Sequence, residues 1–279
     1  MEVKMQIPNA WSVFNQLATP YQKRPGYAVE VLRSLDKRLA HTRGTARIAD
    51  IGSGTGIFTR QIAEHVTNAF AIYGIEPSIG MRDVACKQDS AKPIEYLSGS
   101  GEAIPLPYRS LDCVTAANSA HRFNRPIFFK QTSNLLRSGG VLLILDNLPS
   151  PNLSSFHDRY LSFQEEHVSS YKRGMNSDGF GGYFFMDICS ELVRSGLYFD
   201  VTKYNWEHEH SLDASSFSEL ANSSSVNLKV IEAIGQTQFD RAVSEIFREN
   251  VSLSGRVTMN YRTEAVFARL AVGTRVGQP

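Results

Sequence analysis

A glycine-rich turn carries the residues of this sequence that are best suited to chemistry. It follows the apolar run Ala46–Ile51 and contains Gly52, Gly54 and Gly56, while the carboxylate of Asp50 stands just before it. Glycines allow a tight turn and a close backbone approach to a ligand, and the helix expected next presents free N–H groups. Because open parallel sheets bind ligands at the carboxyl edge of their strands, this turn predicts a ligand site.

The glycine spacing and the carboxylate together indicate which ligand binds. A dinucleotide site has the pattern G-x-G-x-x-G, whereas the third glycine here comes one position early. Asp50 would repel a pyrophosphate and attract a cationic group, such as the α-amino group of S-adenosylmethionine. Glu76, which ends the next apolar run, suits the ribose hydroxyls of either ligand. The pattern therefore favours S-adenosylmethionine over a nicotinamide dinucleotide.

Two later segments add polar groups at the same sheet edge. Ser98–Pro107 places short polar residues before a proline segment, which suits a loop along an adenine edge. Asn118, Ser119 and His121 follow the apolar run Asp112–Ala117 and are expected at its carboxyl end. Polar motifs that follow several successive strands in order indicate a ligand site more specifically than one glycine-rich turn does.

The elements that must position these residues form an alternating series. Apolar runs of strand length alternate with segments of helical spacing, such as Phe58, Ile62 and Val66. Nearly all-apolar strands separated by helices predict an α/β fold with a doubly wound parallel sheet covered on both faces. The expected strands are Ala46–Ile51, Ala69–Ile75, Ile94–Leu97, Asp112–Ala117 and Val141–Asp146, with a helix over Pro126–Leu136 closed by Ser138–Gly140.

After Asn147 the pattern changes, because prolines and small polar residues mark a joint. We expect one domain over 1–279, with a helical lid (1–44), a cofactor-binding core (45–148), helical cap segments (149–196 and 211–250) and C-terminal strands (197–210 and 256–271). The predicted helices are Phe156–Tyr171 and Tyr183–Arg194, with two or three more in Ser211–Phe247; the predicted strands are Leu197–Tyr204 and Arg256–Leu270. The glycine-rich stretch Lys172–Gly182 is expected to be a loop, with Ser177–Gly182 as the hinge of a lid.

Several segments resemble the class I S-adenosylmethionine-dependent methyltransferases, more narrowly the ubiquinone-biosynthesis-like and trans-aconitate-methyltransferase-like small-molecule enzymes. They are Ala49–Gly56, Gly74–Met81, Gly99–Pro107 and Leu135–Leu142, joined by the weaker matches Tyr21–Tyr27, Ser216–Ser225 and Val257–Glu264. The resemblance implies a mostly parallel, seven-stranded Rossmann-like sheet with a helical cap. This sequence departs from the family at Ser100, where an acid is frequent, and at Arg122, where His-Trp is common in place of His121-Arg122.

Site residues follow from the motifs and the resemblance together. The expected cofactor-binding residues are Tyr21, Asp50, Gly52, Ser53, Gly54, Thr55, Gly56, Glu76, Pro77, Met81, Ser100, Gly101, Glu102, Asn118 and Ser119. The expected substrate-binding residues are Arg24, Tyr27, His121, Arg122, Phe180 and Tyr183. No metal site is expected.

These observations predict methyl transfer to a small metabolite at oxygen, nitrogen or carbon. A sulfonium methyl group is already electrophilic, so positioning and water exclusion can drive an in-line displacement. His121 is the candidate general base, or else an orienting residue. Arg24, Arg122 and Arg125 could hold an anionic acceptor, and the cap aromatics could hold an apolar one. A non-catalytic S-adenosylmethionine-binding sensor or assembly protein is the alternative.

Composition argues against other classes. Lys plus Arg is 29 and Asp plus Glu is 28, which disfavours nucleic acid or an anionic membrane as a partner. No apolar run is long enough for a bilayer, and no secretory signal is recognised. Three dispersed cysteines predict reduced thiols in a cytoplasmic protein. We expect a monomer or a homodimer that acts on a small molecule.

Overall fold

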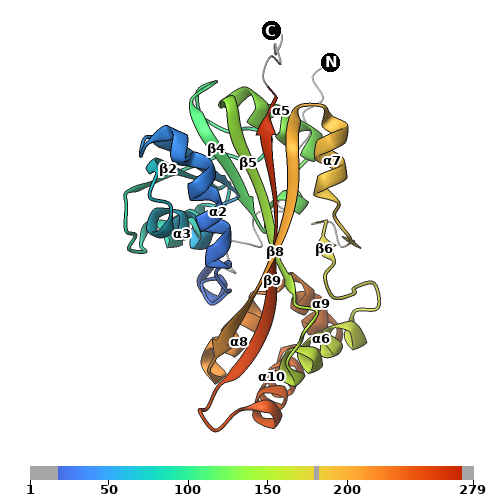
Figure 1. Ribbon diagram of the computed structural model, residues 1–279. Helices are drawn as coiled ribbons and strands as arrows, with labels where there is room; N and C mark the ends of the chain where they lie inside the picture. Colours follow the sequence, from blue (N-terminus) through green and yellow to red (C-terminus); the bar gives the residue numbers. More distant parts are fainter. Residues whose placement is uncertain (1–17, 179–181, 272–279) are drawn as a thin grey trace.

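A twisted sheet forms one lobe of the molecule, and three of its strands continue into a second, helical lobe (Figure 1). The computed structural model describes residues 18–178 and 182–271. The sheet has seven strands in the order β3-β2-β1-β4-β5-β9-β8, and β9 alone runs antiparallel to its neighbours. These strands are β1 (Ala46–Ile51), β2 (Ala69–Ile75), β3 (Ile94–Leu97), β4 (Leu111–Ala117), β5 (Leu136–Pro149), β8 (Tyr198–Leu212) and β9 (Val257–Leu270). The predicted doubly wound α/β fold is confirmed.

Helices cover both faces of this sheet. On one face α2 (Val29–Leu39) and α3 (Ile57–His65) bury apolar stripes such as Leu32 and Ile62 against Ile48 and Leu143 of the strands. On the other, α5 (Arg125–Leu135) and α7 (Ile188–Ser195) pack Phe128 and Leu192 against the strands. α4 (Ile79–Cys86) contacts β3, and the short helices η1 (Ala40–Thr42) and η2 (Ala120–Arg122) complete the lobe.

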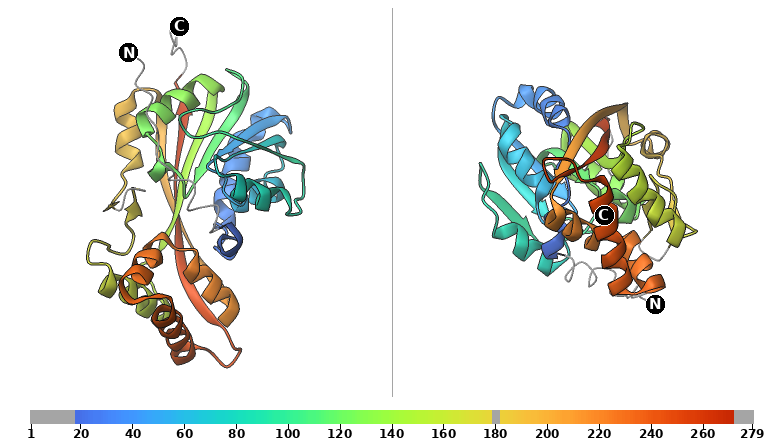
Figure 2. Two further views of the ribbon diagram at one scale, coloured as in Figure 1. Left: turned by 180° about the vertical axis from the view of Figure 1, so that it is seen from behind. Right: turned by 90° about the horizontal axis from the view of Figure 1, so that it is seen from below.

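The second lobe has an apolar core of its own. It is built by α6 (Ser155–His167), α8 (Ala214–Asn222), α9 (Ser225–Ile234) and α10 (Gln236–Asn250) around the far ends of β8 and β9 (Figure 2). Phe156, Phe217 and Phe239 are buried at its centre. Because the strands run through both lobes, the main sheet and the cap share one continuous backbone framework.

Several boundaries differ from the prediction for physical reasons. β8 extends to Leu212 because its last residues alternate between half-buried and exposed, whereas the expected strand ended at Tyr204 where charged residues begin. α6 ends at His167 and not at Tyr171. α5 ends at Leu135, and Gly139 lies at a positive φ of 74° inside β5 where a helix cap was expected.

The predicted helix Tyr183–Arg194 is wrong over its first half. Tyr183–Phe184 form β7, which pairs with β6 (Asn176–Ser177), and α7 begins only after Asp187. The Asp187 carboxylate accepts a hydrogen bond from the Ser190 N–H at 3.1 Å and thereby caps this helix. Phe185, which follows β7, is 67% exposed and lies outside the apolar core. Since α7 packs on the main sheet, the expected cap segment 149–196 is divided between the two lobes.

No helix within residues 18–178 and 182–271 is both long and apolar enough to cross a bilayer.

A buried carboxyl lies on the face of β5 that looks toward α7. Asp146 is 8% exposed and lines a cavity of about 430 Å³ beside Met186, Ile188 and Val266. No hydrogen bond or ion pair joins this carboxyl to another described residue, and Glu264 stands opposite on β9. Burial, with a smaller contribution from Glu264, raises the pKa of Asp146 to about 7 from a reference of 3.8.

Replacement of this carboxyl should stabilise the protein in a pH-dependent way. A raised pKa means that the native state binds the proton more tightly than the unfolded state, so stability falls as the pH rises from about 4 to 7. Asp146→Asn cannot ionise, and it should raise the free energy of unfolding by about 1–3 kcal/mol more at pH 8 than at pH 5. Urea unfolding at both pH values measures this. Equal effects at the two values, or the same trend in the exposed control Glu95→Gln, would contradict it.

Candidate active site

The turn after β1 has the backbone that its glycines predict. Gly52, Gly54 and Gly56 have φ values of 69°, 55° and 79°, and the Gly52 N–H donates to the Ile75 carbonyl at 2.7 Å. A Cβ on Gly52 would lie 2.6 Å from the Ser119 Cβ, whereas one on Gly54 would meet nothing closer than Tyr21, at 3.9 Å. Gly54 is therefore the glycine that faces open space.

Asp50 lies under this turn as a buried acid with two hydroxyl partners. Its carboxylate accepts hydrogen bonds from Thr59 Oγ1 at 2.7 Å and from Thr115 Oγ1 at 2.8 Å. Burial dominates its electrostatics and raises the pKa to about 6, despite the two hydrogen bonds that lower it. A buried, readily ionised carboxylate at this position favours a cationic ligand group.

Glu76 lies across the turn, at the carboxyl end of β2. Its two oxygens accept from the N–H groups of Gly54 at 3.0 Å and Ser78 at 2.9 Å. These bonds hold the carboxylate over the turn, beside a small cavity that we call the turn cavity. Its lining residues are Tyr21, Gly52, Gly54, Glu76, Pro77, Met81, Ser100, Asn118, Ser119, Arg122 and Phe123.

Most of the predicted cofactor-binding residues meet in the turn cavity, whereas Glu102, Gly101 and Gly56 do not line it. The Glu102 carboxylate accepts from the Asn124 N–H at 2.7 Å and so holds the loop before α5. Gly101 lies behind Phe123, where a Cβ would come within 2.6 Å of the ring. Gly56 sits beneath Tyr96, away from the cavity. Phe123 also lines the cavity and was not predicted, because its only signal in the sequence is its place just after Arg122.

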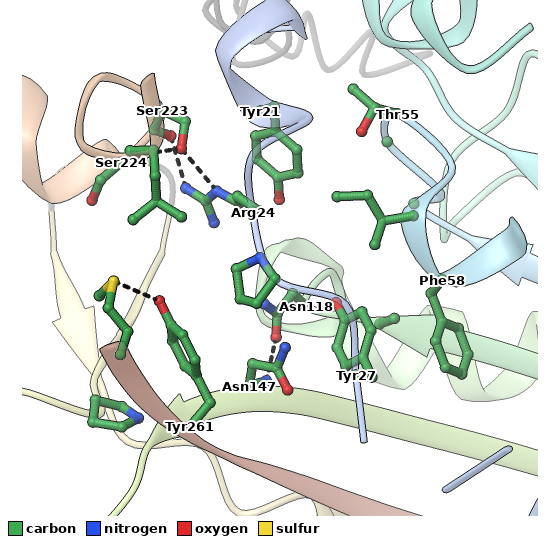
Figure 3. A pocket seen from close by; sticks show the side chains of 18 of the residues that line it. Tyr21, Arg24, Tyr27, Thr55, Phe58, Asn118, Asn147, Ser223, Ser224 and Tyr261 are labelled. Atoms are coloured by element: carbon green, nitrogen blue, oxygen red, sulfur yellow. Dashed lines mark hydrogen bonds between the residues drawn. The ribbon is translucent and has the colours of Figure 1, made fainter. Parts of the chain in front are cut away.

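A larger cavity of about 210 Å³ begins at the Asp50 side of the turn and reaches the second lobe (Figure 3). We call it the junction cavity. Tyr21, Arg24 and Tyr27 line it from the N-terminal segment, beside Ser53 and Thr55 of the turn. On the cap side its lining residues are His157, Tyr160, Leu161, Gln164, Tyr171, Leu220, Ser223, Ser224, Met259 and Tyr261. Leu220, Ser223, Ser224, Met259 and Tyr261 lie in the two weaker matches to the family, Ser216–Ser225 and Val257–Glu264, but none of the cap-side residues was predicted as a site residue.

Arg24 closes one wall of the junction cavity. Its guanidinium stacks on the Tyr21 ring, 4.2 Å from the centroid, and donates to the Ser223 carbonyl at 2.7 Å and hydroxyl at 3.2 Å. Figure 3 shows this guanidinium between the N-terminal segment and the cap. Arg24 therefore ties the two lobes together beside the cavity.

The Asn147 amide connects four segments around the cavity. Its backbone N–H donates to Asn118 Oδ1 at 2.8 Å, and its side-chain Nδ2 donates to the Gly26 carbonyl at 2.9 Å. Its Oδ1 accepts from Thr263 Oγ1 at 2.6 Å and lies 3.2 Å from His208 Nε2. Every polar atom of this side chain is thus used to hold the N-terminal segment, β8 and β9 together.

His121 lies in η2 and lines an adjoining cavity, which we call the arginine cavity, with Arg24, Arg122 and Tyr183. Burial, reinforced by Arg122, Arg24 and Arg125, lowers the pKa of His121 to about 3. Such a neutral imidazole accepts protons weakly, which favours the orienting role over the general base. Arg125 is held by Glu191 instead of facing the cavity. The predicted Phe180 lies outside the described residues.

The site passes a test of fit for the expected cofactor. Ser53 Oγ and Thr55 Oγ1 are buried without a hydrogen-bond partner, and both residues line the junction cavity. Unpaired buried hydroxyls call for a polar ligand group. Together with Asp50 for an amino group and Glu76 for ribose hydroxyls, they match the polar end and the sugar of S-adenosylmethionine. Among the described residues, no group of three potential ligands could hold a metal ion.

Comparison with known proteins finds similarity to methyltransferases over part of the chain. Residues 49–144 match the family model of a methyltransferase domain. A Dictyostelium discoideum protein named as a methyltransferase is 35% identical over 132 residues, which is 47% of each chain. The ubiquinone/menaquinone biosynthesis C-methyltransferase UbiE of Pseudomonas aeruginosa is 29% identical, over 53% of this chain and 62% of its own. The match thus spans about half to three fifths of these relatives.

Solved structures extend the likeness of fold to nearly the whole chain. A type II methyltransferase structure from Anaeromyxobacter dehalogenans aligns with a TM-score of 0.60 at 16% identity, covering 89% of this chain and 97% of that one. The [4+2]-cyclase SpnF aligns with a TM-score of 0.53 at 14% identity, covering 95% and 96%. Because one of these folds carries a cyclase, the fold alone does not specify methyl transfer.

The Asp50 assignment predicts a pH-dependent affinity for S-adenosylhomocysteine, which retains the α-amino group. Binding of the ammonium requires the ionised carboxylate, so the affinity should be constant above about pH 7 and fall progressively below pH 6. Asp50→Asn should remove this dependence and weaken binding at pH 8 by about 1–3 kcal/mol. Isothermal titration between pH 5 and 8 measures both. An Asp50→Asn protein that retains the wild-type pH profile would exclude this role.

The Glu76 assignment predicts a loss specific to the ribose. Glu76→Gln should weaken S-adenosylhomocysteine by about 1–3 kcal/mol because one charged acceptor is lost. The same titration with the 2′-deoxyribose analogue should show a smaller loss. Glu95→Gln, an exposed acid of the adjoining strand, serves as the control and should bind normally. An equal loss for ribose and deoxyribose ligands would count against a ribose contact.

Proposed function

We propose that the chain is a class I S-adenosylmethionine-dependent methyltransferase and that it methylates a small anionic acceptor. The match of residues 49–144 to a methyltransferase domain supports the first part of this proposal. The observation that carries this proposal is the position of Arg24 and Arg122, which both line the arginine cavity next to the cofactor turn. Guanidinium groups pair with carboxylates and other oxyanions through directed hydrogen bonds. An anionic acceptor would offset the positive charge that these side chains place there.

The proton chemistry of the site favours a carboxylate among the anionic acceptors. The pKa values of His121 and His157 are lowered to about 3 and 4, and burial raises the pKa of the Tyr160 phenol to about 12. None of these groups is a strong base poised near neutral pH, as acceptors that must lose a proton require. A carboxylate is already nucleophilic and needs no proton removal. Methyl ester formation is therefore the reaction that we infer.

S-adenosylmethionine supplies an electrophilic methyl group on a sulfonium. The carboxylate oxygen forms the new bond to the methyl carbon as the carbon–sulfur bond breaks, and that bonding pair stays on sulfur. The protein's part is to hold and orient the reactants and to exclude water. Asp50 and Glu76 hold the amino and ribose groups, while Arg24 and Arg122 orient the acceptor. The N-terminal segment and cap, joined through Arg24 and Ser223, exclude water.

A non-catalytic S-adenosylmethionine-binding sensor or assembly protein is the second candidate. The fold does not decide between the two, because SpnF, a [4+2]-cyclase, has a similar fold. A sensor would bind S-adenosylmethionine through Asp50 and Glu76 and would show no turnover with any acceptor.

The test is an acceptor screen with S-adenosylmethionine that follows formation of S-adenosylhomocysteine and detects methyl esters by mass spectrometry. We expect turnover with at least one small carboxylic acid and none with its primary amide. Turnover confined to amines or carbon acids would refute a carboxylate acceptor. Tight cofactor binding without any turnover would instead support the sensor.

Arg24 should control acceptor affinity more than cofactor affinity. Arg24→Gln removes the charge and should raise KM for the acid about 10- to 100-fold, the range for a lost charged hydrogen bond. The dissociation constant of S-adenosylhomocysteine should change less than about threefold, within the scatter of a surface change. Arg33→Gln, which alters an exposed arginine of α2, is the control. Equal losses of acceptor and cofactor would place Arg24 in the cofactor site.

A further inference from the structure

We propose that the cap side of the junction cavity is a donor subsite, in which His157 and Tyr160 select an oxygen-only group of the acceptor such as a carboxylate. The inference rests on the proposed function and adds the residues that determine acceptor specificity. Both side chains belong to α6, both are more than nine-tenths buried, and both line the junction cavity. Neither belongs to a motif of the methyltransferase domain, which ends at residue 144.

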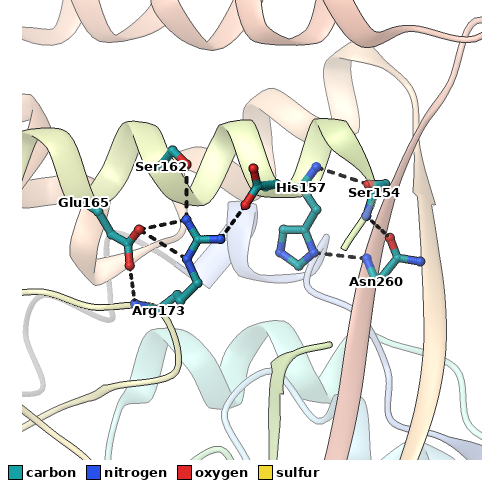
Figure 4. Close-up of polar contacts among 7 residues, drawn as sticks. Ser154, His157, Ser162, Glu165, Arg173 and Asn260 are labelled. Carbon is teal, nitrogen blue, oxygen red and sulfur yellow. Dashed lines mark hydrogen bonds and ion pairs between the residues drawn. The ribbon is translucent and has the colours of Figure 1, made fainter. Parts of the chain in front are cut away.

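His157 is held in a single tautomer by the backbone behind it. The Asn260 N–H of β9 points at Nδ1 over 3.1 Å (Figure 4). A backbone N–H can only donate, so Nδ1 must be the accepting nitrogen and the proton of the neutral ring resides on Nε2. Among residues 18–178 and 182–271, none accepts a hydrogen bond from Nε2. The imidazole therefore brings one N–H donor to the cavity wall.

The contacts around His157 keep the ring from turning over. The backbone N–H of His157 donates to Ser154 Oγ at 3.1 Å, and Asn260 Oδ1 accepts from the backbone N–H of Ser154 at 2.8 Å. The ring packs on Tyr261 with centroids 5.2 Å apart. Figure 4 shows this cluster beside the Arg173 guanidinium, which is held by Glu165 and Asp158. Burial and Arg173 oppose protonation of the ring, so His157 stays a neutral donor near pH 7.

The Tyr160 hydroxyl is fixed in a similar way, by a hydrogen bond from the side-chain amide of Asn227. Asn227 Nδ2 donates to the Ala221 carbonyl at 2.8 Å and to the Tyr160 oxygen at 2.7 Å, while Asn227 Oδ1 accepts from Gln164 Nε2 at 2.9 Å. Because a carbonyl can only accept, the amide cannot be flipped. The phenol oxygen must therefore accept from Asn227, and the Gln164 side chain is its second hydrogen-bonding neighbour. A ligand oxygen in the cavity would compete with Gln164 for the phenol proton.

The remaining groups on the cap side match a ligand oxygen. Tyr171 and Tyr261 also line this part of the cavity, and the charge of Arg24 acts on both Tyr160 and Tyr261. None of the cap-side lining residues is acidic. A carboxylate has acceptors only and can satisfy these donors, whereas a primary amide brings N–H groups that meet no charged acceptor here. The subsite should therefore distinguish an acid from its amide.

The experiment measures binding of benzoate, succinate and their primary amides to the protein saturated with S-adenosylhomocysteine. The wild type should bind at least one acid about tenfold or more tightly than its amide. His157→Asn retains a short amide that can accept from Asn260 and has no atom at the position of Nε2. Tyr160→Phe removes only the hydroxyl. Each should weaken the acid about 10- to 100-fold and the amide less than about threefold, so the acid-to-amide ratio collapses.

Matched controls separate recognition from folding. His167→Asn changes another histidine of α6. Tyr198→Phe, in β8 of the main sheet, removes a buried phenol that is hydrogen-bonded to Thr132 of α5. Both should leave the acid-to-amide ratio unchanged. The proposal is overturned if no acid binds the wild type, if acid and amide bind alike, or if neither variant changes the ratio. S-adenosylhomocysteine is titrated first, so failure of the cofactor site itself is recognised separately.

Discussion

The rest of the site depends on one residue, Asn147, which is hydrogen-bonded to four segments of the chain at once. Its side-chain Oδ1 accepts from Thr263 of β9 and lies within hydrogen-bond distance of His208 of β8, and its Nδ2 donates to Gly26 of the N-terminal segment. Its backbone N–H donates to Asn118, which follows β4. A half-buried residue with these groups paired is costly to disturb, because a broken bond can leave an unsatisfied polar atom. The junction cavity is therefore bounded by segments whose relative positions are set by hydrogen bonds, with the cofactor turn on one side and the cap on the other.

The two sides of the cavity use opposite electrostatic designs. At the turn, buried carboxylates face the cavity, and burial raises the pKa values of both Asp50 and Glu76, which suits a ligand that brings positive charge and hydroxyl donors. On the cap side, Asn260 and Asn227 donate to His157 Nδ1 and to the Tyr160 oxygen, so the ring proton of neutral His157 is on Nε2. A positively charged cofactor and an anionic acceptor would thus meet between walls of complementary sign, and this polarity favours their alignment before any bond changes.

The sequence predicted the main sheet well and the cap poorly, for the same physical reason. β1 and β2 were predicted with the observed bounds because both are nearly continuous apolar runs bounded by turn residues. β8 was cut short at Tyr204, since its outer half is buried on one side only and carries Glu207, His208 and Glu209. The turn residues, including Asp50 and Glu76, were predicted because they belong to short motifs that follow successive strands in order. His157 and Asn227 could not be predicted, because their roles depend on contacts between α6, α9 and β9 that no local sequence pattern records.

The position of β9 has a consequence for how the chain acquires its structure. This strand is the last of the sheet in sequence, yet it lies between β5 and β8 and reaches both lobes. Until residues 257–270 are in place, β5 is paired with β4 alone and β8 has no partner strand in the sheet. The chain must therefore be synthesised through this strand before the two lobes can close. Pairings of such sequence separation fold slowly and leave strand edges exposed in the interim. A ribosome-bound nascent chain that lacks this strand is therefore the form most exposed to aggregation, and completion of the cavity is among the last events of folding.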